Sequence, residues 1–217
     1  MELFKANDLE VKVNDRYHLK NLNFEIADNE ITLIYSSSNE SEKLLETLIY
    51  KNKPVSGSLF YGNEDLSTFT RSNLEEWRIK DIQYVSIKSH LFDELSVREN
   101  IYLPLTLNRV EEDEEYMISL FEELDLLDLI DYKVTNITKL DYYKTLIARA
   151  LSLKPFVLLI DNIEKDFSKA ELDILLDSLT HINNLYKTAI VISTSNIELK
   201  RVASKTLIIE DGTIKNV

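Results

Sequence analysis

Two short polar segments of the chain carry the side chains best placed to bind or transform a ligand. The first reads Ser36-Ser37-Ser38-Asn39-Glu40-Ser41-Glu42-Lys43 and joins an apolar run at 31–35 to leucines at helical spacing. A helix N-terminus in that place favours an anion, although the serines could equally cap the free helix amides. The second segment is Asp161-Asn162, which directly follows the apolar run 156–160. Asp161 is either a site residue or a cap on the end of a strand.

Other arrangements that carry chemistry are missing from the sequence. There is no cysteine, and the three histidines stand apart, without the spacing of metal ligands. No serine, histidine and aspartate form a nucleophile pattern. The acidic run 111–115 is explained as a solvated helix start, where acids are favourable. We therefore expect no metal centre and no catalytic residue of these kinds.

Hydrophobic periodicity indicates the elements that must position the two segments. Alternating apolar residues at 9–13 and 22–26 predict strands, and the fully apolar run 156–160 predicts a central strand buried on both faces. Further strands are predicted at 31–35, 82–87, 189–193 and 206–210, and helices at 44–49, 71–80, 112–131, 140–151 and 172–182, the last after a capping box of Ser168 and Glu171. The alternation of helix and strand predicts a layered α/β domain.

Composition limits the class of protein. The chain has 217 residues, 44% hydrophobic and 29% charged, which suits one globular domain. The formal net charge of −13 argues against nucleic acid as the main partner, because phosphate backbones are bound by clustered lysine and arginine. No apolar run reaches the ~18 residues of a membrane span, and the N-terminus has no signal pattern. We expect a cytoplasmic protein.

Several short segments, in order and at matching spacing, resemble one protein family. They read LKNLNFEI at 19–26, KPVSG at 53–57, LSVRENI at 95–101, ARAL at 148–151 and DG at 211–212. The sequence resembles the nucleotide-binding subunit of ABC transporters over about 9–215, most closely the lipoprotein-release, macrolide-export and FtsE-type subfamily. The resemblance implies a single ABC-type domain over 1–217, with a P-loop NTPase-like core, an antiparallel β subdomain and a helical subdomain at roughly 90–150.

The chain departs from that family at the phosphate-binding loop. The family reads G-x-x-x-x-G-K-[ST], whose glycines let backbone amides surround phosphate. Here Ser36 and Ser41 stand at the glycine positions, Glu42 at the lysine and Lys43 at the magnesium-binding hydroxyl. A shift of one residue that brings Lys43 towards phosphate is the alternative that keeps the loop active.

The other functional positions of the family also differ. Asp161 matches the aspartate that holds magnesium, but Asn162 replaces the general-base glutamate, and an amide cannot act as a base. The family's Q-loop glutamine maps to Ile87, its LSGGQ signature to 137–141 (ITKLD) and its switch histidine to Ser195. The aromatic that stacks on adenine maps near Val13, with Tyr17 as a nearby substitute. We predict vestigial, inactive nucleotide-site positions at Ser36, Asn39, Ser41, Glu42, Lys43, Asp161, Asn162 and Ser195.

The resemblance leads to a pseudo-ATPase hypothesis. We expect no catalytic residues and no cofactor, with ATP and magnesium as the alternative. The expected role is a structural or regulatory subunit on the inner face of the membrane, bound to an integral permease-like protein. It would pair with a second ABC-type subunit, either itself or an intact ATPase. Predicted contacts to the membrane subunit are Ile87, Phe92, Leu95 and Asn100, with Trp77 as an anchor or a core residue. An atypical ATPase working with an intact partner and a soluble scaffold remain open.

Overall fold

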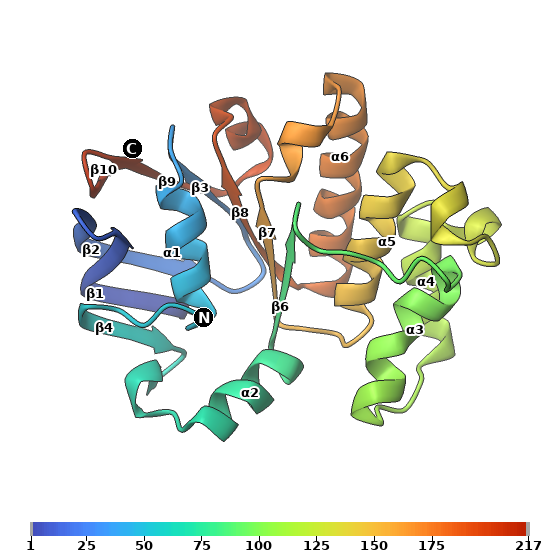
Figure 1. Ribbon diagram of the computed structural model, residues 1–217, viewed down its shortest axis with the longest axis horizontal. Coiled ribbons are helices and arrows are strands. Elements are labelled where there is room, and N and C mark those ends of the chain that lie inside the picture. Colours follow the sequence, from blue (N-terminus) through green and yellow to red (C-terminus); the bar gives the residue numbers. More distant parts are fainter. Residues whose placement is uncertain (1, 216–217) are drawn as a thin grey trace.

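The chain folds around a six-stranded sheet in the order β10-β9-β3-β8-β7-β6 (Figure 1). The computed structural model describes residues 2–215, apart from the side chain of Asp166. The strands are β3 (Ile31–Tyr35), β6 (Ile82–Ser86), β7 (Val157–Asp161), β8 (Ala189–Thr194), β9 (Lys205–Glu210) and β10 (Thr213–Lys215). All neighbours pair in parallel except β9 and β10. Every residue of β7 and β8 is buried, and for β7 this is what its apolar run predicts.

A second, antiparallel sheet has the order β2-β1-β4-β5. Its strands are β1 (Glu2–Asn14), β2 (Tyr17–Ala27), β4 (Ser56–Tyr61) and β5 (Glu64–Asp65). Gly57 lies where β4 passes close to β1, with a φ of +78°. A Cβ atom there would lie 2.3 Å from the carbonyl oxygen of Asp8, so this position requires glycine.

Helices cover both faces of the large sheet. They are α1 (Glu40–Leu48), α2 (Arg71–Lys80), α3 (Val97–Asn108), α4 (Glu114–Glu123), α5 (Lys139–Leu151) and α6 (Lys169–Tyr186). Leu44, Leu45 and Leu48 place α1 in a core shared by the two sheets, whereas α3 to α6 share a core with the other face of the large sheet. Along β7, Val157 and Leu159 therefore face α1, and Leu158 and Ile160 face the helices.

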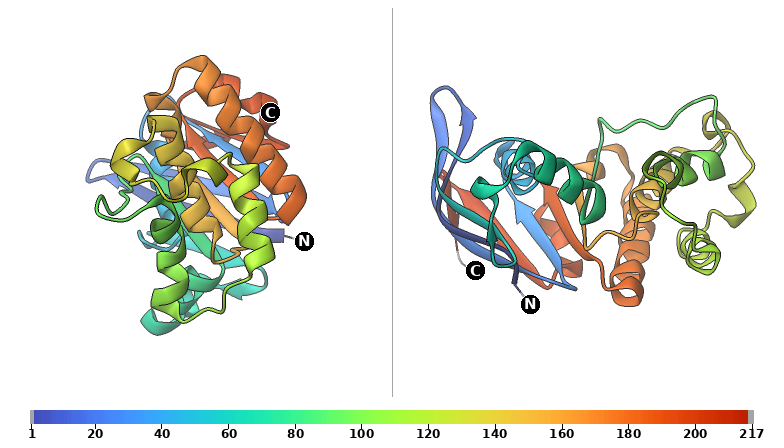
Figure 2. Two further views of the ribbon diagram at one scale, coloured as in Figure 1. Left: turned by 90° about the vertical axis from the view of Figure 1, so that its right-hand side faces the viewer. Right: turned by 90° about the horizontal axis from the view of Figure 1, so that it is seen from below.

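The region 97–151 forms a helical lobe beyond the β6 edge of the sheet (Figures 1 and 2). Within it, the predicted helix at 112–131 is shorter than expected. It ends at Glu123, because Asp125 has a φ of +51°, and the chain continues as a short 3-10 turn at Leu127–Leu129. The capping box of Ser168 and Glu171 at the start of α6 is confirmed. No helix within residues 2–215 is long and apolar enough to cross a membrane.

Candidate functional site

The loop from β3 to α1 is organised around the carboxylate of Glu40. The hydroxyls of Ser36 and Ser38 donate to Glu40 Oε2 at 2.6 and 2.9 Å, and the Tyr17 hydroxyl donates to Glu40 Oε1. Ser36 is fully buried, and Glu40 is 7% exposed. The loop therefore contains a negative charge that belongs to the chain itself.

Hydrogen bonds keep this carboxylate ionised. Burial opposes ionisation, but donors on Ser36, Tyr17 and Ser38 outweigh it and hold the pKa of Glu40 below its usual range. The same contact raises the pKa of the Tyr17 phenol to about 12. Tyr17, suggested as an adenine-stacking aromatic, is thus hydrogen-bonded to the loop through its hydroxyl.

The expectation that the loop serines cap the helix amides is wrong. Asn39 occupies the N-cap position and makes no side-chain cap hydrogen bond. Ser41 is fully buried, and its Oγ has no hydrogen-bond partner among the described residues. The Ser36 hydroxyl does accept one amide, from Ser38 at 3.2 Å, but it donates to the carboxylate of Glu40. The reason is that an ionised acceptor forms a stronger hydrogen bond than a neutral one.

The ammonium of Lys43 is held by a side chain further along α1. Its Nζ lies 2.7 Å from Glu46 Oε2, while Lys51 Nζ lies 2.6 Å from Oε1 and Asn52 Nδ2 donates at 2.8 Å. Burial opposes ionisation of Glu46, but the hydrogen bonds and charges of both lysines lower its pKa to about 2. Glu42, at the family's lysine position, pairs with the exposed Lys88 at 2.9 Å. Both charged residues at the end of the loop are therefore neutralised by partners inside the chain.

Asp161 lies at the carboxyl end of β7, next to the ends of β6 and β8. Its Oδ1 accepts from the hydroxyl of Ser193 and from Asn162 Nδ2 at 2.7 Å, and its Oδ2 accepts from the Tyr84 hydroxyl at 3.2 Å. Asp161 is 3% exposed, and the burial of Tyr84, together with the charge of Asp161, raises the pKa of the Tyr84 phenol. Both carboxylate oxygens thus have donors from within the sheet.

Asn162 follows in the left-handed region, with a φ of +47°. Asparagine tolerates that conformation better than most residues. Its backbone amide donates to the Ser193 carbonyl at 3.0 Å, and its side chain is 6% exposed. Asn162 therefore joins the ends of β7 and β8.

Glu164 is a buried acid that the sequence patterns did not single out. Its Oε1 accepts from the Thr194 hydroxyl at 2.5 Å and from the Ser195 amide at 3.0 Å, so it fixes the turn that carries Ser195. The Ser195 side chain itself is exposed. Nothing in the sequence around Glu164 marks this pairing, because its partners lie thirty residues later.

The predicted partner-binding residues separate into two groups. Ile87 and Phe92 are 38% and 57% exposed, and Leu95 is half-buried. Asn100 is fully buried, so its prediction as a direct contact is wrong. Its amide instead binds the loop, accepting from the Phe92 amide at 2.8 Å and donating to the Phe92 and Ser96 carbonyls at 3.1 and 3.0 Å. Asn100 therefore fixes the backbone of the exposed Phe92, while its own side chain does not reach the protein surface.

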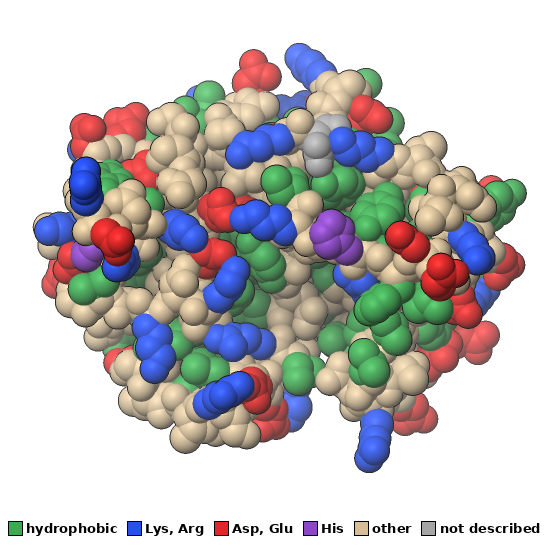
Figure 3. Space-filling model, viewed as in Figure 1, with side chains coloured by type: hydrophobic (Ala, Val, Ile, Leu, Met, Phe, Trp, Pro, Cys, Tyr) green, Lys and Arg blue, Asp and Glu red, His purple; other side chains and the backbone are tan. Residues whose placement is uncertain are grey.

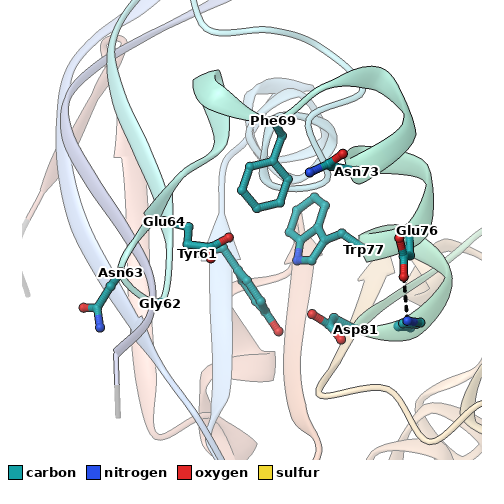
Figure 4. A pocket seen from close by; sticks show the side chains of 10 residues that line it. Tyr61, Gly62, Asn63, Glu64, Phe69, Asn73, Glu76, Trp77 and Asp81 are labelled. Atoms are coloured by element: carbon teal, nitrogen blue, oxygen red, sulfur yellow. Dashed lines mark hydrogen bonds and ion pairs between the residues drawn. The ribbon is translucent and has the colours of Figure 1, made fainter.

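Trp77 belongs to the core. It is 6% exposed and packs edge-on against Tyr61 and Phe69, with ring centroids 5.2 and 6.1 Å away. These rings form one wall of a surface pocket of about 600 Å³, which also contains Asp81, and Figure 4 shows Trp77 pointing into their cluster. None of the loop residues 36–43 lines this pocket.

The layered sheet and the strand, loop and helix at 31–48 define the α/β fold of an ABC-type cassette. Over residues 19–164 the sequence matches the family described as ABC transporter. The chain belongs to the ABC transporter family, as a cassette subunit.

Known proteins similar to the chain agree with this assignment. The lipoprotein-releasing system ATP-binding protein LolD of Geobacter metallireducens is 27% identical over 199 residues, or 90% of this chain and 88% of that protein. CbiO1 of Clostridium perfringens, part of an ABC transporter complex, superimposes with a TM-score of 0.88 at 19% identity, covering 99% of this chain and 87% of its own. The cassette MJ0796, solved as a dimer and also bound to ADP and Pi, gives 0.81 at 20% identity, covering 99% and 97%. At these identities the two structures show the fold alone.

Proposed function

We propose that the chain is a non-catalytic cassette subunit, which docks on a permease-like membrane protein as a structural or regulatory component. The observation that carries the proposal is the position of Glu40. An ionised carboxylate of the chain itself occupies the loop that would have to receive the phosphates of a nucleotide. The hydroxyl donors of this loop are already hydrogen-bonded to Glu40, so they are not free to bind a phosphate.

Electrostatics support this proposal. Two unit charges ~5 Å apart at an effective dielectric of ~20 repel by roughly 3 kcal/mol, so Glu40 alone disfavours a phosphate in its loop. The attraction of the α1 N-terminus for an anion contributes only about 0.3–1 kcal/mol in an exposed setting. Lys43 could compensate only by leaving Glu46, which would leave a buried carboxylate with fewer partners. Repulsion is the larger effect.

The groups that would hold magnesium and activate water fit poorly as well. Asp161 has donors on both oxygens, and the hydroxyl position of the family is taken by the cationic Lys43. Asn162 carries an amide where a general base would stand, and an amide does not accept a proton at neutral pH. These features support a subunit that neither binds nor hydrolyses ATP.

The kinds of partner proposed for this chain come from similar proteins. CbiO1 is part of an ABC transporter complex, and MJ0796 forms a dimer. By analogy we place this chain at the inner face of the membrane, with a permease-like protein and a second cassette, its own copy or an intact ATPase. The apolar contacts for the membrane subunit are the exposed Ile87 and Phe92, and the buried Asn100 fixes the backbone of Phe92.

The test is gentle detergent purification of the tagged chain from native membranes, followed by mass spectrometry and a Mg-ATPase assay. The proposal expects a multi-spanning membrane protein, and any ATPase activity should be unchanged by Asp161→Ala in this chain. Recovery with soluble proteins only would favour a scaffold. Activity that disappears with Asp161→Ala would show an atypical ATPase.

A further inference from the structure

The pocket beside Trp77 is formed by α2 and by the turn between β4 and β5. It has a volume of about 600 Å³, and its lining includes residues of 61–64 and of 69–81. Within residues 2–215, no part of α3 lines it, so it is separate from the hollow that Figure 3 shows between the part of the molecule that carries α1 and α2 and the lobe that carries α3. The pocket is therefore independent of the loop 36–43 and of the contacts proposed for the membrane subunit.

The indole nitrogen of Trp77 lacks an acceptor. Trp77 is 6% exposed, and its buried Nε1 makes no hydrogen bond with any described residue. Figure 4 shows this nitrogen on the side of the indole that faces the Tyr61 hydroxyl and the Asp81 carboxylate. Burial and then the charge of Asp81 raise the pKa of the Tyr61 phenol, and the influence of Trp77 on it is weaker. A buried indole N–H usually has a hydrogen-bond partner, so this one marks a place for an acceptor.

The carboxylate of Asp81 lacks a cation. Asp81 is half-buried, and its side chain makes no hydrogen bond or ion pair with any described residue. Burial raises its pKa, and the charge of Lys80 opposes this less strongly, because the Lys80 ammonium is held by Glu76, with Nζ 2.6 Å from Oε1. Asp81 is also the C-cap of α2, where the helix dipole disfavours an anion. Glu64, exposed on the turn, is likewise unpaired among the described residues, so the pocket contains two uncompensated carboxylates.

We propose that this pocket binds a small amino alcohol, whose hydroxyl accepts from Trp77 Nε1 and whose ammonium group pairs with the carboxylate of Asp81. An amine without a hydroxyl would leave the indole N–H unpaired, and a neutral alcohol would leave the carboxylate uncompensated. The carbon atoms of the ligand lie against the rings of Tyr61 and Phe69, and aromatic rings also attract an ammonium group. Because Nε1 is closed to solvent, the hydroxyl reaches it when the half-buried Asp81 side chain turns.

The experiment uses the indole N–H resonance as the reporter. Trp77 is the only tryptophan in the sequence, so the indole gives a single peak in the ¹H–¹⁵N spectrum of the purified full-length chain. The chain is titrated at pH 7 with ethanolamine, ethylamine and ethylene glycol, a comparison that needs no variant. Ethanolamine is then titrated into Asp81→Asn, which removes the charge and keeps the shape. Glu75→Gln is the matched control, since Glu75 is an exposed acid of α2 that does not line the pocket, and thermal unfolding midpoints show that both variants are folded.

The inference expects a saturable downfield shift of the indole peak with ethanolamine, at least fivefold weaker binding of ethylamine, and no saturation with ethylene glycol. Asp81→Asn should weaken ethanolamine binding at least tenfold, and Glu75→Gln less than twofold. Ethylamine or ethylene glycol that binds as tightly as ethanolamine would overturn the inference, as would a folded Asp81→Asn chain that binds within twofold of the unmodified one. An indole peak that no probe moves would show a pocket filled by water only and would also overturn it. None of these outcomes bears on the proposed function, because no nucleotide or membrane protein takes part.

Discussion

Glu46→Gln is expected to lower the free energy of unfolding by about 2 kcal/mol at pH 7. The Glu46 side chain is 7% exposed and is bound by Lys43 and Lys51. Its pKa of about 2 lies below the ordinary 4.5. That difference corresponds to about 3.4 kcal/mol at 1.36 kcal/mol per pKa unit. Solvent screening reduces this, because Lys51 is 58% exposed.

The pH dependence of this variant follows from the direction of the pKa change. The pKa of Glu46 is lower in the folded state, so its contribution is complete above about pH 4.5 and is lost as the pH falls towards 2. Glutamine does not titrate. The stability difference between the unmodified chain and Glu46→Gln should therefore shrink by about 1 kcal/mol between pH 7 and pH 3.5.

Urea unfolding followed by circular dichroism measures both quantities. Glu75→Gln is the matched control, since it removes an exposed helical ion pair with Arg71 and should cost less than about 0.5 kcal/mol. A Glu46→Gln chain as stable as the control at pH 7 would refute the reasoning. A difference that stays constant down to pH 3.5 would also refute it, because Glu46 would then not be the titrating group.

Three further changes test other parts of the account. Glu40→Gln should lower the Tyr17 pKa from about 12 towards 10, since the main cause of the rise is the contact with Glu40; NMR titration of the tyrosine ring measures it. An unchanged Tyr17 pKa would contradict the described contact. Asn162→Glu should leave Mg-ATP hydrolysis at background in a phosphate-release assay, and measurable turnover would show that the loop accepts nucleotide. Asn100→Ala should cost about 1–3 kcal/mol, because it leaves the backbone amide of Phe92 without its acceptor, whereas the carbonyls of Phe92 and Ser96 keep their bonds from the Leu95 and Asn100 amides. Hydrogen exchange at the Phe92 amide should rise with it, and unchanged protection would contradict that role.

Much of the fold could be predicted from local patterns. The strand at 157–161 follows from an unbroken apolar run, and α6 from its capping box and leucine spacing. Helix α4 was predicted too long, because the apolar stripe continues through Leu124 and Leu127; Leu124 is buried although the helix has ended, whereas Leu127 is 41% exposed. The spacing of apolar residues indicates which side chains are buried, and it does not indicate where the helix ends.

The interior of the site could not be predicted in the same way. The sequence indicates which family positions changed, but the role of Glu40 depends on Tyr17, more than twenty residues away on β2. Lys43 looked free to reach a phosphate, and only the fold brings Lys51 and Glu46 around it. Asn100 was predicted as a partner contact because it lies in the segment after the Q-loop position that resembles the family, whereas here its amide closes a loop.

The most direct test of the central claim is isothermal titration of the purified full-length chain with Mg-ATP, alone and in the complex recovered from membranes. The account predicts no saturable binding to this chain at millimolar nucleotide, and no difference between the unmodified chain and Asp161→Ala. Binding in the micromolar range that requires magnesium and is lost with Lys43→Ala or Asp161→Ala would contradict it. The loop would then open to nucleotide, and the carboxylate of Glu40 would not be its permanent occupant.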